Sequence, residues 1–65
     1  MTYELNASFD QADPAREAER KLQALRVTGI THGEDGMSFT AVVEDGVVDR
    51  AVQVIRQSGG TADWH

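Results

Sequence analysis

The chain has 65 residues, of which 40% are hydrophobic, and it carries a formal net charge of −5. This length predicts a single domain over residues 1–65 with one small core, and the hydrophobic content is too high for intrinsic disorder. The absence of cysteine excludes disulfides and thiolate metal sites, and the acidic balance disfavours nucleic acid and anionic lipid as partners.

Residues 2–9 alternate apolar and polar side chains, which is the period of a strand with one buried face. Tyr3, Leu5, Ala7 and Phe9 are the apolar set, so we expect them to face the core.

The next segment, from Asp13 to about Arg26, changes to helical periodicity. Its apolar positions are Ala15, Ala18, Leu22 and Leu25. Asp13 is predicted to be the N-cap, because its side chain can accept a hydrogen bond from a free N–H group of the first turn. Pro14 is predicted at the first helical position, where the backbone N–H that proline lacks has no partner in the helix.

A hairpin is predicted in the middle of the chain. Residues 30–32 form a short, weakly marked strand, and Asp35-Gly36 is a typical turn sequence. Residues 37–44 form the third strand, in which Phe39, Ala41 and Val43 should face the core and alternate with Ser38, Thr40 and Val42.

A second helix is predicted from Asp45-Gly46, although its four valines lower helix propensity. The three- and four-residue spacing of the apolar positions favours a helix. One face of this helix would carry Val48, Ala51, Val52 and Ile55, with Val47 and Val54 beside them. Gly59-Gly60 should end this helix, and residues 61–64 can form a closing edge strand.

The predicted order is strand, helix, strand, strand, helix, strand. Two right-handed crossover units of this kind give an α+β, ferredoxin-like βαββαβ sandwich. In that fold a four-stranded antiparallel sheet carries both helices on one face, and the first and third strands lie in the middle.

The stretch from Tyr3 to Leu22 and the stretch from Ala51 to Gly60 resemble a heavy-metal-associated domain, the small module of copper chaperones and metal-transporting ATPases. In that family a loop with two cysteines separated by two residues joins the first strand to the first helix. Aligning the helix on Leu22 places Gln11 and Pro14 at the cysteine positions. Because thiolates select Cu(I), the metal transport that the resemblance implies does not extend to this chain.

A candidate cation site follows from the predicted topology. The first two strands run parallel to each other, so the residues after them meet at one edge of the sheet. The residues concerned are Asp10, Asp13, His32, Glu34 and Asp35. Carboxylates and one imidazole suit a hard or borderline divalent cation. The alternative interpretation is that these residues are solvated caps and turn formers.

The sheet face without helices is the second candidate site. Its residues are predicted to be polar but small, and with Trp64 they form the candidate interface: Asn6, Ser8, Ser38, Thr40, Val42 and Trp64. Another sheet or helix could approach such a face closely, although an ordinary hydrated face has the same composition. Trp64 either completes the core beside Ala62 or points outward as an anchor.

These patterns predict a small non-catalytic binding module without a cofactor, which acts through the open sheet face or an edge strand. The expected partner is a protein or a second copy of the chain. The alternatives are metal handling through carboxylates and His32, and a small-ligand sensor. No apolar run is long enough for a membrane span and no signal peptide is evident, so a cytoplasmic protein without membrane contact is expected.

Overall fold

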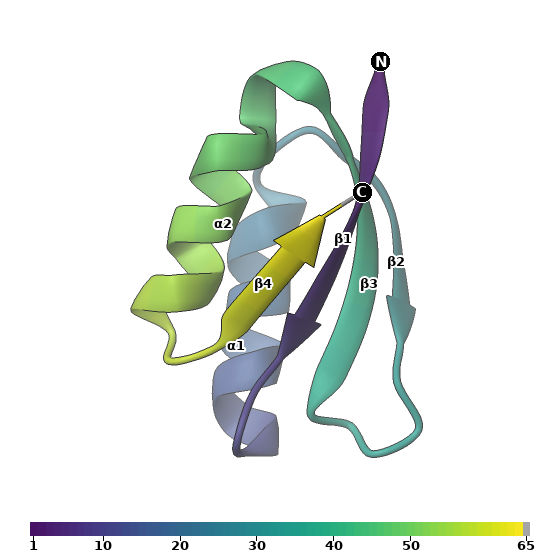
Figure 1. Cartoon of the computed structure of the whole chain (residues 1–65). Coiled ribbons are helices and arrows are strands. Elements are labelled where there is room, and N and C mark those ends of the chain that lie inside the picture. Colours follow the sequence, from purple (N-terminus) through teal and green to yellow (C-terminus); the bar gives the residue numbers. More distant parts are fainter. Residues whose placement is uncertain (65) are drawn as a thin grey trace.

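The computed structural model describes residues 1–64 and shows an α+β arrangement (Figure 1). His65, expected at the end of the last strand, lies outside the described residues. The elements follow in the order β1 (Thr2–Ser8), α1 (Ala12–Gln23), β2 (Val27–His32), β3 (Ser38–Glu44), the short 3₁₀ helix η1 (Asp45–Val47), α2 (Val48–Gln57) and β4 (Thr61–Trp64).

The four strands form one antiparallel sheet in the order β2-β3-β1-β4, so the first and third strands are central, as predicted. The pairing of β1 with β3 runs without interruption from Thr2↔Glu44 to Ser8↔Ser38. Both helices lie on the same side of the sheet, which leaves its other face open (Figure 1).

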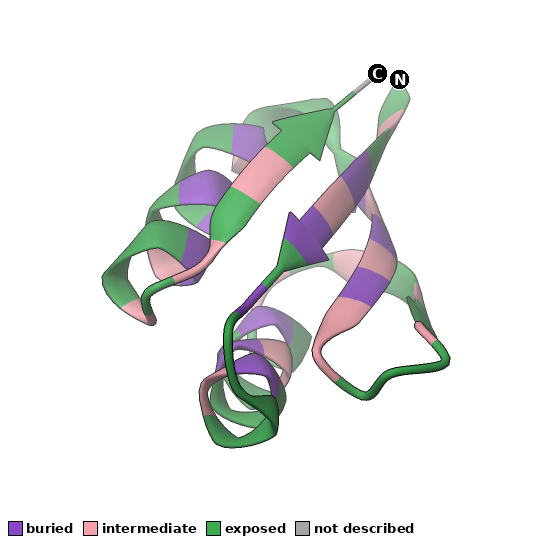
Figure 2. Cartoon of the chain, turned by 60° about the horizontal axis from the view of Figure 1, so that its bottom comes forward, coloured by how far each residue is buried: buried purple, intermediate pink, exposed green. Residues whose placement is uncertain are grey.

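The core lies between the helices and the two central strands (Figure 2). The strands contribute Leu5, Ala7, Phe39, Ala41 and Val43, the residue after β1 contributes Phe9, and the helices contribute Ala15, Ala18, Leu22, Val48, Ala51, Val52 and Ile55. Tyr3 is only partly buried and packs against this cluster. The alternating and helical patterns therefore identified the buried faces correctly, because burial of apolar surface is what both patterns reflect.

The start of α1 differs from the prediction. The N-cap is Gln11, which has an extended backbone and makes no side-chain capping bond, and the helix begins at Ala12. Asp13 is therefore not the cap but the second helical residue, and Pro14 is the third. The chain tolerates Pro14 there because the first four N–H groups of a helix have no intrahelical partner.

This uncapped start gives a simple prediction. Gln11→Ser should stabilise the protein by about 0.5–2 kcal/mol, because serine can accept a bond from a free N–H group of the first turn. Urea unfolding followed by circular dichroism measures the effect. Asp13→Ala is the control: without a capping role, Asp13 contributes only its interaction with the helix dipole, about 0.3–1 kcal/mol. A loss of more than about 1 kcal/mol for Asp13→Ala, or no gain for Gln11→Ser, would contradict this assignment.

Strand β2 is longer than predicted, because it begins at Val27 instead of Ile30 and α1 ends earlier, at Gln23. A β-bulge explains why its pattern was weak: the register shifts between Val27↔Val43 and Gly29↔Val42. The Thr28 hydroxyl donates to the carbonyl oxygen of Val42 at 3.1 Å beside the shift. An inserted residue breaks the two-residue alternation that marks a strand.

The end of α2 follows the prediction. Gly59 has a positive φ of 90°, and its N–H donates to the Arg56 carbonyl at 3.0 Å. The Gly60 N–H donates to the Ile55 carbonyl at 2.9 Å. These two bonds form a Schellman motif, which satisfies the last carbonyls of the helix and turns the chain into β4.

Candidate functional site

The residues predicted as a cation site are dispersed in the structure. Asp10 and Asp13 are exposed around the start of α1, His32 ends β2, and Glu34 and Asp35 lie in the β2–β3 turn. Within residues 1–64, no group of three or more histidine, aspartate or glutamate side chains is placed to hold a metal ion. The shared sheet edge therefore does not bring the five side chains into one cluster.

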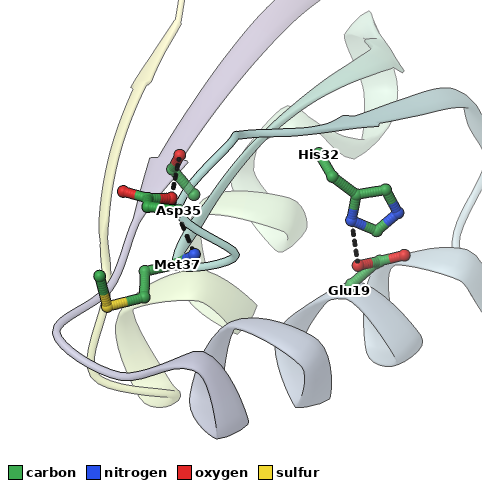
Figure 3. Close-up of polar contacts among 5 residues, drawn as sticks. Glu19, His32, Asp35 and Met37 are labelled. Carbon is green, nitrogen blue, oxygen red and sulfur yellow. Dashed lines mark hydrogen bonds and ion pairs between the residues drawn. The ribbon is translucent and has the colours of Figure 1, made fainter.

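Asp35 is held by its own turn (Figure 3). Its carboxylate accepts from the Met37 N–H at 2.9 Å and from the Ser38 hydroxyl at 3.2 Å. The Met37 N–H is the main reason that the pKa of Asp35 lies below its usual value, and the Ser38 hydroxyl adds to the effect. An aspartate whose carboxylate accepts hydrogen bonds from the next few residues stabilises the turn, and this role is common for Asp in turns.

The lowered pKa predicts a pH dependence. The unfolded aspartate has the higher pKa, so the stabilisation is fully present above about pH 4 and is lost as the pH falls through the folded pKa. Asp35→Asn keeps an acceptor but does not titrate, so the stability difference between wild type and this variant should shrink on acidification. Urea unfolding at a series of pH values measures that difference, and a difference independent of pH would contradict the role of Asp35.

His32 has a partner that sequence analysis missed. Its Nδ1 lies 3.2 Å from Oε2 of Glu19 in α1, with the two side chains 65% and 16% exposed (Figure 3). Glu19 follows Ala15 by four residues and precedes Leu22 by three, so helical spacing places it beside the buried stripe. That spacing was the only signal for its position in the sequence.

The open face collects most of the predicted interface. Strand register places Asn6 opposite Thr40 and Ser8 opposite Ser38 on this face, with Val42 in line. The Thr40 hydroxyl donates to Oδ1 of Asn6 at 2.8 Å, so these two polar groups already satisfy each other.

Trp64 is separated from that group. It pairs with Leu5, whose side chain is buried on the helix side, so Trp64 also belongs to the helix side of the sheet. Its position at the end of an edge strand leaves it 48% exposed. Trp64 thus does not extend the polar interface predicted on the open face.

The free edge of β2 presents unpaired backbone groups. The Gly33 N–H donates to the Ser38 carbonyl at 2.8 Å, toward β3. Because backbone groups alternate in direction along a strand, the N–H and C=O groups of Ile30 and His32 point away from β3. In the part of the chain that the structure describes, no strand lies on that side of β2.

A groove of about 270 Å³ runs beside this edge, between β2 and α1. It is lined by Glu19, Gln23, Val27, Thr28, Gly29, Ile30 and His32. Ile30 and His32 pair with Ala41 and Phe39, so their side chains lie on the helix side and form one wall of the groove. Glu19 is the only aspartate, glutamate, lysine or arginine among the lining residues.

The chain matches no protein-family model, no curated protein and no solved structure. In residues 1–64 there is no helix with the length and apolar character needed to cross a membrane. The functional assignment therefore depends on the geometry of the chain itself.

Proposed function

We propose that the chain is a ferredoxin-like domain that acts without catalysis, as a binding module for other proteins. Its contact surface is the free edge of β2 together with the groove beside α1. The observation that carries the proposal is the outward direction of the Ile30 and His32 backbone groups directly beside that groove. An extended segment of a partner can satisfy these groups by adding a strand to the sheet.

The two edge strands of the sheet differ in how well they are protected against pairing with a further strand. Strand β2 has six residues and contains neither a charged residue nor proline. Strand β4 has only four residues and includes Asp63, whose charge disfavours pairing with a further strand. The bulge near Thr28 disturbs one end of β2 and leaves the part around Ile30 and His32 regular. Edge pairing is therefore favoured at β2.

The lining of the groove suits binding better than catalysis. It brings together one carboxylate, one imidazole and one amide, and its only hydroxyl belongs to Thr28. That hydroxyl already donates to the Val42 carbonyl, and within residues 1–64 no side chain accepts a hydrogen bond from it as a base would. The open face supports binding less well, because Asn6 and Thr40 satisfy each other.

A pair of substitutions at one position tests the edge. His32→Pro removes an outward N–H without removing a bond to β3, whereas His32→Ala removes the same imidazole and keeps the N–H. Ten-residue peptides selected from a random displayed library against wild type are the probe. We expect His32→Pro to bind them at least about tenfold more weakly than His32→Ala, since ladder bonds carry strand addition.

Isothermal titration calorimetry measures the affinities, and amide NMR spectra of both variants check that the fold is retained. Equal affinities of the two variants for the selected peptides would contradict the proposal. Failure of the library to yield any peptide that binds wild type would contradict it as well.

A further inference from the structure

We propose that the strand bound at β2 carries a lysine or arginine whose side chain enters the groove and pairs with Glu19. This inference rests on the proposed function and names the chemical class of the partner: an extended polypeptide segment with a cationic residue on the side that faces α1. Three features of the groove support it, namely the direction of the side chains, the position of Glu19 and the local charge.

The direction follows from the sheet. In an added strand, alternate residues lie on the helix side, next to the Ile30 and His32 side chains. These residues of the partner therefore enter the space between β2 and α1. Val27 and Ile30 line one end of that space and favour an apolar partner residue, an even number of positions from the cationic one.

The Glu19 carboxylate is within reach of that space. It projects from α1 to the end of β2, where Oε2 lies 3.2 Å from the His32 imidazole (Figure 3). A side chain entering beside His32 thus meets the carboxylate directly. The length of lysine or arginine suits this approach, since the chain of either residue can lie along Ile30 while its charged end reaches the oxygens.

No lysine or arginine of the described chain lies within ion-pair distance of Glu19. Its side chain is only 16% exposed, and in residues 1–64 its one ion-pair neighbour is His32, which carries no permanent charge. Arg16 lines the adjacent depression with Glu19 but is not within ion-pair distance. A partly buried carboxylate gains more from a cation than a fully exposed one, because water screens the pair less.

A second copy of the chain fits this groove less well. The residues that its β2 would offer on the helix side are Val27, Ile30 and His32, none of which carries a permanent positive charge. Each copy also has a net charge of −5, so the two would repel each other. The groove is therefore better suited to a basic segment of a different protein.

The test uses the peptides selected against wild type, as described above. The selected peptides should be enriched in lysine or arginine. This basic residue should lie an even number of positions from an apolar residue of the same peptide. Glu19→Gln keeps the shape of the side chain and removes its charge. It should weaken binding by about tenfold and reduce the dependence of affinity on salt. Glu17→Gln is the matched control: it removes an exposed charge from the same helix but does not line the groove.

A double-mutant cycle locates the contact. When the peptide lysine is replaced by norleucine, Glu19→Gln should cause no further loss, because the two changes remove one interaction. Additive losses of affinity from the two changes would overturn the inference, and so would selected peptides that lack basic residues. Strand addition itself is tested separately, by the comparison of His32→Pro with His32→Ala. A dimer of the wild type that sedimentation detects and His32→Pro abolishes would also overturn it, because a second copy would then occupy the edge.

Discussion

Phe39→Ala is expected to destabilise the protein by about 3–5 kcal/mol. Phe39 is 3% exposed and lies on the central strand β3, where it pairs with Ala7 on one side and His32 on the other. Its ring also stacks on Phe9 with the centroids 5.9 Å apart. Native domains are stable by only about 0.05–0.15 kcal/mol per residue, which is about 3–10 kcal/mol for 65 residues, so this loss removes about a third of the stability or more.

Urea unfolding followed by circular dichroism measures this loss. Phe39→Leu is the control, because it keeps an apolar side chain of similar volume and should cost less than about 1.5 kcal/mol. A Phe39→Ala protein with the midpoint of the wild type would show that the ring does not hold the two central strands and the helices together.

Gly60→Ala should destabilise the protein by about 1–3 kcal/mol through overpacking. A Cβ at this position would meet the Phe9 ring, with Cδ2 at 2.7 Å and Cζ at 2.8 Å. The backbone cannot withdraw easily, since the Gly60 N–H donates to the Ile55 carbonyl in the Schellman motif. The ring cannot move freely either, because it stacks on Phe39.

Thermal unfolding compares this variant with Gly46→Ala, whose Cβ would meet nothing within 4 Å. Gly46→Ala should be neutral or stabilising by up to about 1 kcal/mol, because alanine restricts the unfolded chain. Phe9→Leu in the Gly60→Ala background should recover part of the loss, since the smaller side chain leaves room for the Cβ. Equal stability of the two alanine variants would contradict the close approach of Gly60 to Phe9.

The sequence was most informative where local pattern and burial coincide. The alternation around Leu5 and Phe39 located the central strands, and the spacing around Ile55 located the inner face of α2. The prediction was wrong at the N-terminus of α1. Asp13 is a residue type that helix caps prefer, but the helix already begins at Ala12, with Gln11 as its N-cap. It was incomplete at β2, because a bulge hides the alternation on which strand prediction depends.

The candidate site was harder to predict for a different reason. The two-residue alternation alone was enough to place Asn6 and Thr40 on the open face, and the strand register agrees. Whether His32 contacts an acid from its own turn or one from α1 depends on the distance between a helix and an edge strand, which no local pattern encodes. The groove and its Glu19 carboxylate arise from that distance.

The pairing of β1 with β4 has a consequence for how the chain folds. Leu5 in β1 pairs with Trp64 in β4, so two residues near opposite ends of the sequence become neighbours in the sheet. Closing so long a loop is entropically costly, whereas the β2–β3 hairpin closes only a short one. The hairpin can therefore form early, while β1 becomes a central strand only when both of its distant neighbours arrive. We expect this topology to fold more slowly than a helical bundle, in about milliseconds, and β4 must be synthesised before the first strand can be enclosed.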